Sequence, residues 1–312
     1  MRKITLIRVL YFTEGGRSLF ESLREKSGNF IFCDMPPEMS RDDYVKESFL
    51  LHIPLIFIGS CGIAVRLIAP YVKDKLYDPP VIVMDEGGYF VIPLLSGHYG
   101  GGYYIARKLS KSLSAKLIST SASDVNNTFA IEVFAKRNGF FISDNDHELI
   151  KKVNSAALSG EKPDLNYLSD GTIEVMGLKL YPKTLCLGMG SKKGKSFEEL
   201  KAYLNRFFDD EKLRRELYAI GTVDLKAEEA GLLTLAAFYG AFFFTYTKEE
   251  LSAVTYDGLS KSDFVKETVG VDNVCERAAL LLSGGEELLL SKKAGDGITI
   301  ASAKRIVRIG EI

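Results

Sequence analysis

Short apolar runs alternate along the chain with segments in which apolar side chains recur every three or four positions. Residues 51–60 (LHIPLIFIGS) form a run with almost no polar interruption, which predicts a buried strand. The apolar residues of 63–71 share one face of a 3.6-residue period, so a helix is expected to follow. Residues 81–85 and 89–95 predict two strands, and the Glu-Gly-Gly between them indicates a hairpin.

The strand signal weakens in the middle of the chain. Residues 103–114 predict a helix, and residues 129–139 predict another that is closed by its final glycine. A helix over 147–158 and a small hairpin over 171–181 are expected next. We interpret 129–182 as a small middle segment of mixed α and β structure.

The second half resumes a regular alternation of strands and helices. Ser196-x-x-Glu199 and Thr247-x-x-Glu250 are capping boxes, which predict where two of the helices begin. The strands expected are 184–189, 217–223, 241–246, 288–290 and 298–301, and the other helices expected are 224–239 and 273–282. Strands that alternate with helices favour an α/β domain with a largely parallel sheet.

These patterns predict an α/β protein in three parts. A chain of 312 residues exceeds the usual size of one domain. We expect an N-terminal α/β domain over 1–128, the middle α+β segment over 129–182, and a C-terminal three-layer α/β domain over 183–312 whose sheet is largely parallel.

Composition and charge narrow the class of function. The chain is 46% hydrophobic and 26% charged, which is typical of a globular protein, and its net charge of −1 gives no overall attraction for nucleic acid or an anionic membrane. The longest apolar run, 232–246, contains a glycine and is shorter than the roughly 20 residues that a membrane span needs. The four cysteines have neither disulfide nor zinc spacing. We expect a cytoplasmic protein with reduced thiols, no metal site, and no nucleic-acid or membrane partner.

A glycine- and lysine-rich sequence, GMGSKKGKS (188–196), joins a predicted strand to a predicted helix. It resembles a P-loop, but three or five residues stand where that motif needs four, so its amides would be misplaced for a nucleotide. Three lysines before a helix N-terminus still favour an anion. The alternative is a strand–helix turn with solvated lysines.

A second glycine-rich junction, GHYGGG (97–102), holds one of the three histidines of the chain. Backbone donors beside an imidazole suit an oxyanion site with a general acid or base at His98. The alternative is that the glycines allow tight packing of helix on strand and that His98 only caps the helix. The residues alone leave the two interpretations about even.

Two further junctions carry charged side chains. GSCGIAVR (59–66) follows a predicted strand, and Arg66 is a candidate partner for a carboxylate or for an internal salt bridge. Asp224-x-Lys226-x-Glu228 opens a predicted helix, either as an ion-pair cluster at a site or as an ordinary first turn, which its spacing favours.

Several long motifs, in order, resemble the cobalamin-biosynthesis protein G family, the cobalt-precorrin-5A hydrolases. The N-terminal signature is similar to GSCGIAVRLIAPYVKDKLYDPPVIVMDEGGYFVIPLLSGHYGGG, continued by SASD with Asn126 and Asn127. The C-terminal domain is similar to LGMGSKKGKSFEEL, GTVDLKAEEAGLLTLA and DFVKETVGVDNVCERAALLLSG. The family loop usually reads Gly-x-Gly-Cys-Arg-Arg-Gly-Thr. Here Ser191, Lys192 and Lys193 replace Cys-Arg-Arg, and Lys195 replaces the threonine, so a cysteine nucleophile is absent at that position.

The resemblance implies a reaction. The substrate would be a cobalt-bearing tetrapyrrole with a δ-lactone. Water would open the lactone, and the two-carbon unit at C-20 would leave as acetaldehyde to give cobalt-precorrin-5B. No cofactor separate from the substrate is implied, because the tetrapyrrole carries the cobalt. Other enzymes of the cobalamin pathway are the partners that this role implies, and the sequence leaves a homodimer open.

Set beside this chemistry, the motifs yield candidate site residues. His98 is the first candidate for acid or base, with Asp224 and Glu228 next. Gly100 and Gly101 are expected to offer N–H donors, and Arg66, Lys192 and Lys193 to hold carboxylates. The residues expected to line the substrate are Ser60, Arg66, Ser96, Gly97, Gly100, Gly101, Gly190, Ser191, Lys192, Lys193 and Lys226. Two other functions stay open: a non-catalytic tetrapyrrole carrier that serves a methyltransferase of the pathway, and a phosphate- or nucleotide-binding transferase.

Overall fold

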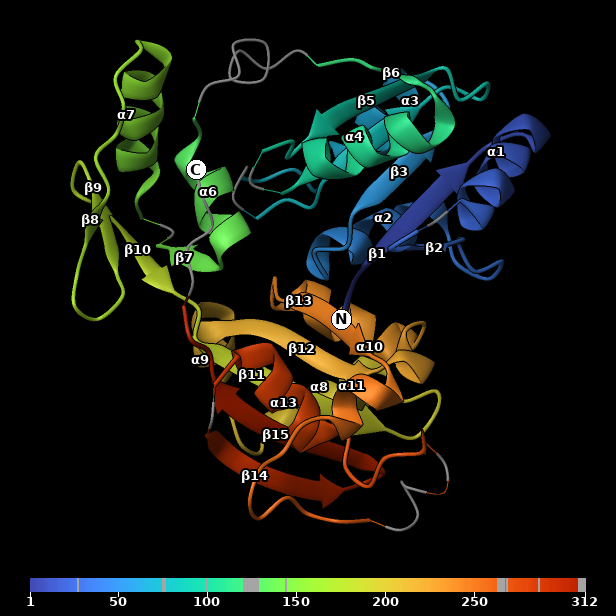
Figure 1. The fold of residues 1–312 in the computed structure, drawn as a ribbon. Coiled ribbons are helices and arrows are strands. Elements are labelled where there is room, and N and C mark those ends of the chain that lie inside the picture. Colours follow the sequence, from blue (N-terminus) through green and yellow to red (C-terminus); the bar gives the residue numbers. More distant parts are fainter. Residues whose placement is uncertain are drawn as a thin grey trace. The chain divides into compact units, whose positions relative to one another are not determined.

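The computed structural model describes residues 1–26, 28–74, 77–98, 100–119, 129–143, 145–262, 267, 269–285 and 287–307 (Figure 1). The chain forms two units. The N-terminal unit is Leu6–Pro182, and the C-terminal unit combines Met1–Thr5 with Lys183–Arg308. The SASD motif, Asn126 and Asn127 lie outside the described residues. The three-part division expected above stays a prediction.

The main sheet of the N-terminal unit has the strand order β2-β1-β3-β4-β5-β6. β1, β3 and β4 are parallel, β5 is antiparallel to β4, and β6 is parallel to β5. The elements are β1 (Arg2–Tyr11), α1 (Glu14–Glu25), β2 (Phe30–Cys33), α2 (Arg41–Leu50), β3 (Leu55–Ile58), α3 (Cys61–Ile68), β4 (Val81–Met84), β5 (Phe90–Leu95), α4 (Gly102–Leu113) and β6 (Lys116–Leu117). The expected hairpin is confirmed as β4–β5.

Helices bury both faces of this sheet, which explains the uninterrupted apolar runs. Ile56 and Ile58 of β3 pack in one buried cluster with residues of α1 and α4. Leu55 and Phe57 pack in another with residues of α2 and α3. Alternate side chains of a strand point to opposite faces, so a strand covered on both sides is apolar at every position.

A small antiparallel sheet follows in the same unit, with the order β7-β10-β9-β8. Its elements are α6 (Ile131–Asn138), β7 (Phe140–Ile142), α7 (His147–Leu158), β8 (Asn166–Tyr167), β9 (Ile173–Val175) and β10 (Leu178–Pro182). The predicted closure of a helix by Gly139 is confirmed, because this residue caps α6 with a left-handed φ of 71°.

The C-terminal unit is built on the strand order β14-β15-β11-β12-β13, with Arg2–Ile4 of β1 as an added antiparallel edge. β11, β12 and β13 are parallel, and β15 and β14 are antiparallel to their neighbours. The elements are β11 (Leu185–Ser191), α8 (Phe197–Leu204), α9 (Asp210–Glu216), β12 (Leu217–Val223), a 3₁₀ helix (Asp224–Lys226), α10 (Ala230–Phe238), β13 (Phe242–Tyr246), α11 (Lys248–Ser252), α13 (Cys275–Ser283), β14 (Leu288–Gly295) and β15 (Ile298–Lys304).

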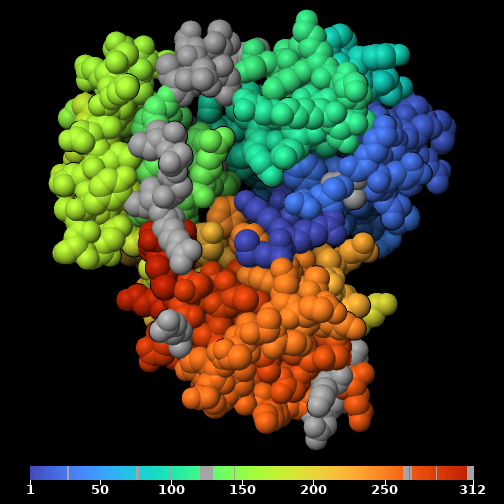
Figure 2. Space-filling view, viewed as in Figure 1, coloured from blue at the N-terminus to red at the C-terminus, as the bar shows by residue number. Residues whose placement is uncertain are grey.

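Helices cover both faces of this sheet, so the predicted three-layer α/β class is confirmed. α13 and α11 pack on the sheet face that carries Cys186, Ala219 and Val223. In the space-filling view, most of the visible surface of this unit is orange and red, the colours of the last helices and strands (Figure 2). Both predicted capping boxes are present, at Ser196 before α8 and at Thr247 before α11.

Two expectations for the C-terminal unit gain detail. The segment 224–239, expected to be mostly helix, is so, but it is divided: a 3₁₀ turn ends at Lys226, and α10 begins at Ala230. β14 and β15 extend to Gly295 and Lys304, beyond the short strands predicted. β14 pairs with β15 up to the turn at Asp296-Gly297, and β15 pairs with β11 as far as Lys304.

Candidate functional site

Residues 96–102, here called the glycine turn, join β5 to α4, and their glycines are required by space. A Cβ on Gly100 would lie 2.5 Å from the backbone oxygen of Ser96, and one on Gly97 would lie 2.4 Å from the Tyr103 ring. Gly101 has a left-handed φ of 85°. These contacts support tight packing as one reason for the glycines, the alternative that the sequence left open.

The turn already uses some of its backbone donors. The N–H of Gly101 donates to the His98 oxygen at 3.0 Å, and that of Gly102 donates to the Ser96 oxygen at 3.3 Å. Among the described residues, the Gly100 N–H has no acceptor. Of the two predicted oxyanion donors, Gly100 is therefore available as the structure stands, whereas Gly101 would first have to release His98.

The side chains of Ser96 and His98 are half-buried. The His98 ring packs against the Tyr103 ring with centroids 4.9 Å apart. Ser96 has a left-handed φ of 50°, and its buried hydroxyl has no partner among the described residues. Lys136 of α6 donates from Nζ to the Gly100 oxygen at 2.9 Å. The sequence reasoning missed Lys136, since nothing local marks a contact between residues 36 positions apart.

Ser60 does not lie beside the glycine turn, contrary to the single site expected for these junctions. Ser60 follows the carboxyl end of β3, where it caps α3 by accepting from the Ile63 N–H at 3.3 Å. Ser96 follows β5, which runs antiparallel, so Leu95 pairs with Val81 at the start of β4. The two junctions are at opposite edges of the sheet. Arg66, on α3, donates to the Gly62 oxygen at 3.5 Å, toward the Ser60 end.

The C-terminal unit does bring its predicted residues together. β11 and β12 are parallel neighbours, so their carboxyl ends share one sheet edge. The loop that follows β11, residues 192–196 (here the lysine loop), therefore lies next to the segment 224–229 that follows β12. Lys192 and Lys193 are exposed, as are Asp224 and Glu228, whereas Gly190 and Ser191 are half-buried. The Ser191 hydroxyl has no partner among the described residues.

Glu229, which the sequence reasoning missed, connects the two segments. Its carboxylate accepts from the Gly194 N–H at 2.9 Å and from Lys226 Nζ at 2.8 Å. The side chains of Lys226 and Glu229 are only 19% and 13% exposed. Lys226, predicted to hold substrate, is thus already paired, and its charge is largely compensated inside the protein.

The surroundings of Glu229 favour its ionised form. Burial by itself would raise the pKa of this carboxyl, but hydrogen bonds from Lys226 and the Gly194 N–H outweigh it and lower the pKa. Because its pKa is lower in the folded state, Glu229 stabilises the protein at pH values above its unfolded-state pKa of about 4.3. This stabilisation is lost as the pH falls through the folded-state pKa.

We therefore expect Glu229→Gln to reduce the free energy of unfolding by roughly 1–3 kcal/mol at pH 7, because two charge-assisted hydrogen bonds are weakened. The difference from wild type should shrink as the pH drops below about 4. Urea unfolding between pH 3 and 7 measures it, with Glu228→Gln as the control for an exposed neighbouring carboxylate. An equal difference at pH 3 and pH 7 would contradict this role.

The described residues contain no group of three or more His, Cys, Asp or Glu side chains placed to hold a metal ion. Within the same part of the chain, every helix is too short or too polar to cross a membrane. The glycine turn and the lysine loop with its neighbours present lysine and amide donors, an imidazole and carboxylates.

Comparison with known proteins gives the class of this chain. The family described as cobalamin synthesis G N-terminal matches residues 43–124, and the family described as cobalamin synthesis G C-terminus matches residues 185–303. The chain is an α/β protein that contains both modules, and it belongs to the cobalamin synthesis G family.

Individual relatives agree. A protein of Salmonella typhimurium named cobalt-precorrin-5A hydrolase is 35% identical over 82% of this chain and 83% of its own. One of Priestia megaterium with the same name is 32% identical over 80% and 78%. Among solved structures, a cobalamin biosynthesis protein G homologue from Sulfolobus solfataricus is 21% identical over 97% of each chain, with a TM-score of 0.41. The family assignment rests on the sequence matches.

Proposed function

We propose that this protein is an enzyme of cobalamin biosynthesis that hydrolyses the δ-lactone of cobalt-precorrin-5A and releases acetaldehyde, giving cobalt-precorrin-5B. The observation that carries the proposal is the match to two relatives named cobalt-precorrin-5A hydrolase, each over about four-fifths of this chain. The exposed lysines of the lysine loop support a substrate rich in carboxylates.

The reaction divides into two proton-dependent steps. Water adds to the lactone carbonyl and the ring C–O bond breaks, which leaves a carboxylate and a hydroxyl on the two-carbon unit. Loss of the hydroxyl proton then makes C-20 the carbonyl carbon of acetaldehyde as the bond between C-20 and the macrocycle breaks, and the macrocycle takes up the electron pair and a proton. Both steps need a base, and the first needs a donor for the carbonyl oxygen.

The chain offers groups for each need. His98 is our candidate for acid and base, and the open N–H of Gly100 is the candidate donor for the oxyanion. Lys192 and Lys193 are proposed to hold substrate carboxylates as point charges, without the two-pronged geometry of arginine. Asp224 and Glu228, both exposed at the lysine-loop edge, remain the second candidates for the base. We expect no cofactor beyond the cobalt of the substrate, and a cytoplasmic location.

Two observations bear on the alternative functions. A nucleotide cradle needs free amides, yet the Gly194 N–H is occupied by the Glu229 carboxylate. The nucleotide-binding alternative is therefore disfavoured. A non-catalytic carrier would bind the macrocycle but would not need an acid or base at His98, so the histidine separates that alternative from an enzyme.

The test is to incubate the protein with cobalt-precorrin-5A and measure acetaldehyde. We expect stoichiometric release by wild type and a loss of roughly 10²–10⁴-fold in rate for His98→Ala, with macrocycle binding retained. His147→Ala is the matched control, because this histidine lies on α7 and pairs with Asp74 at 3.4 Å. Full activity of His98→Ala would refute its role, and binding without acetaldehyde from wild type would support the carrier.

A further inference from the structure

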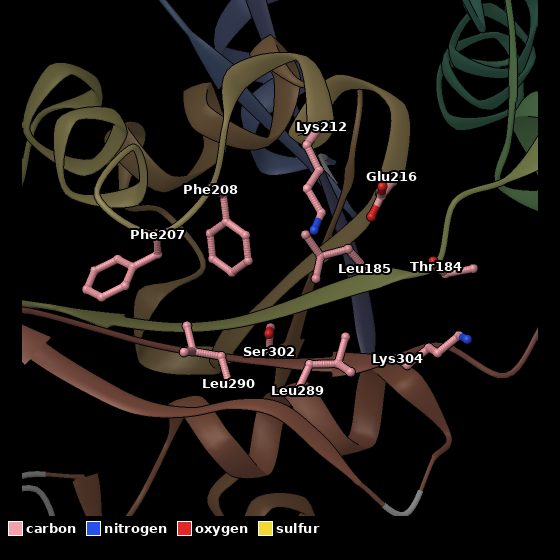
Figure 3. Close-up of a pocket in the computed structure, with 10 residues that line it drawn as sticks. All are labelled: Thr184, Leu185, Phe207, Phe208, Lys212, Glu216, Leu289, Leu290, Ser302 and Lys304. Atoms are coloured by element: carbon pink, nitrogen blue, oxygen red, sulfur yellow. The ribbon is translucent and has the colours of Figure 1, made fainter.

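A pocket of about 500 Å³ lies in the C-terminal unit, on the sheet face opposite α13 (Figure 3). Its residues come from Thr184 and the strand β11 that follows it, the segment between α8 and α9, α9, β14 and β15. They are Thr184, Leu185, Phe207, Phe208, Lys212, Glu216, Leu289, Leu290, Ser302 and Lys304. A volume of this size falls within the roughly 300–1,000 Å³ typical of small-molecule sites. Leu185 at the start of β11 lines the pocket, whereas the lysine loop follows Ser191 at the other end of the strand, roughly 20 Å from Leu185.

The strand register places the floor residues of the pocket on one face of the sheet. Ser302 lies opposite Leu187 on β11, and Lys304 lies opposite Leu185, so Ser302 and Lys304 share one face of β15. On the other side, β14 carries an irregularity: Leu288 pairs with Ala303 and Leu290 with Ser302. The extra residue turns both Leu289 and Leu290 into the pocket.

Above the sheet, the chain between α8 and α9 supplies aromatic walls. Phe207 and Phe208 follow the end of α8, and Lys212 and Glu216, one helical turn apart on α9, complete the rim (Figure 3). Leu289 is 58% exposed and Phe207 is 38% exposed, so the apolar walls are open to solvent.

The pocket contains one polar atom whose hydrogen bonding is incomplete. Ser302 is 1% exposed, and its hydroxyl has no partner among the described residues. A buried hydroxyl without a partner is energetically unfavourable, so such groups are normally satisfied by water or a ligand. In the part of the chain that the structure describes, Lys212 and Lys304 have no carboxylate within ion-pair distance. The rim of the pocket therefore carries two positive charges, from these lysines, and one negative charge, from Glu216.

We propose that this pocket binds a small organic anion with an apolar body, of the arylalkyl carboxylate class. The aromatic and leucine walls would cover the body, and the Ser302 hydroxyl would donate to a polar atom at the floor. A rim lysine would pair with the carboxylate. This site is separate from the proposed reaction, because the lysine loop and the pocket occupy opposite ends of β11.

The experiment uses the full chain and 4-phenylbutyrate as the probe. Saturation-transfer NMR measures the binding of the probe to the protein. 4-Phenylbutylamine, with the same body and the opposite charge, is the matched ligand. We expect the carboxylate to bind at one site with a Kd below about 1 mM and the amine to bind at least about tenfold more weakly. Equal binding of the two ligands, or no binding of the carboxylate, would overturn the proposal.

Variants locate the binding. Ser302→Leu should fill the floor and remove the hydroxyl, which should abolish the carboxylate signal. Lys212→Glu alters only an exposed side chain, so it should fold normally and weaken binding about tenfold or more. Lys293→Glu makes the same charge change on β14 outside the pocket and should leave binding unchanged. Undiminished binding by Lys212→Glu and Ser302→Leu would show that the carboxylate binds elsewhere. If Ser302→Leu does not fold, Lys212→Glu decides alone.

Discussion

Gly188→Ala is expected to unfold the C-terminal unit or to destabilise it by at least about 4 kcal/mol, near the upper end of effects from single substitutions. Gly188 lies in β11 where α13 crosses the sheet. A Cβ at this position would lie 1.7 Å from the backbone oxygen of Cys275 and 2.7 Å from the backbone nitrogen of Ala279. Both obstacles are backbone atoms, so no side-chain rotation relieves the overlap and the whole helix must move.

Hydrogen–deuterium exchange followed by mass spectrometry measures this effect locally, since peptides from β11 and α13 should lose protection. Gly62→Ala is the matched control. Gly62 is in α3, and the atom nearest to the methyl group that alanine would add there is the tip of Arg66, at 3.6 Å. That substitution should leave stability unchanged or raise it by up to about 1 kcal/mol through helix propensity. Native exchange in Gly188→Ala would contradict the close approach of α13.

Glu276→Ala is expected to cost roughly 3–5 kcal/mol, because it leaves one buried and two partly buried donors without their acceptor. Glu276 is 1% exposed, in the first turn of α13. Its two carboxylate oxygens accept from the N–H of Ser260 at 2.9 Å, the N–H of Lys292 at 2.7 Å and the side-chain amide of Asn273. One side chain thus ties β14 and the segment around Ser260 to the start of α13.

Urea unfolding of two variants separates acceptor geometry from general packing. Glu276→Gln keeps the shape, but its NH₂ group must face donors, so its stability should fall between wild type and the alanine variant. Glu287→Ala removes an exposed glutamate from the same unit and should change stability by less than about 0.5 kcal/mol. A Glu276→Ala protein as stable as the Glu287→Ala control would show that these hydrogen bonds contribute nothing net.

The sequence predicted the elements well where a strand is covered on both faces. The runs at 55–58 and 217–223 are apolar because helices pack on each side, and capping boxes marked the starts of α8 and α11. The short strands β7 and β8 were not predicted, because three- and two-residue strands carry too little periodicity.

The site was harder to predict because it depends on strand direction. The hairpin signal between β4 and β5 was recognised, but a hairpin also reverses the chain, which sends Ser60 and the glycine turn to opposite edges. Glu229 was missed for a related reason. A continuous helix from Asp224 would place Asp224 and Glu228 on one face of the helix. The helix is broken after Lys226, which changes the direction of the side chains that follow, and Glu229 is the one that reaches the lysine loop.

The first residues of the chain have a consequence for dissecting the protein. Arg2, Lys3 and Ile4 form ladder pairs with β13, and the N-terminal ammonium group pairs with Glu250. A fragment that starts at Lys183 would therefore expose an unpaired strand edge, which invites intermolecular association. A faithful isolated C-terminal unit would need these few amino acids grafted back, for instance through circular permutation.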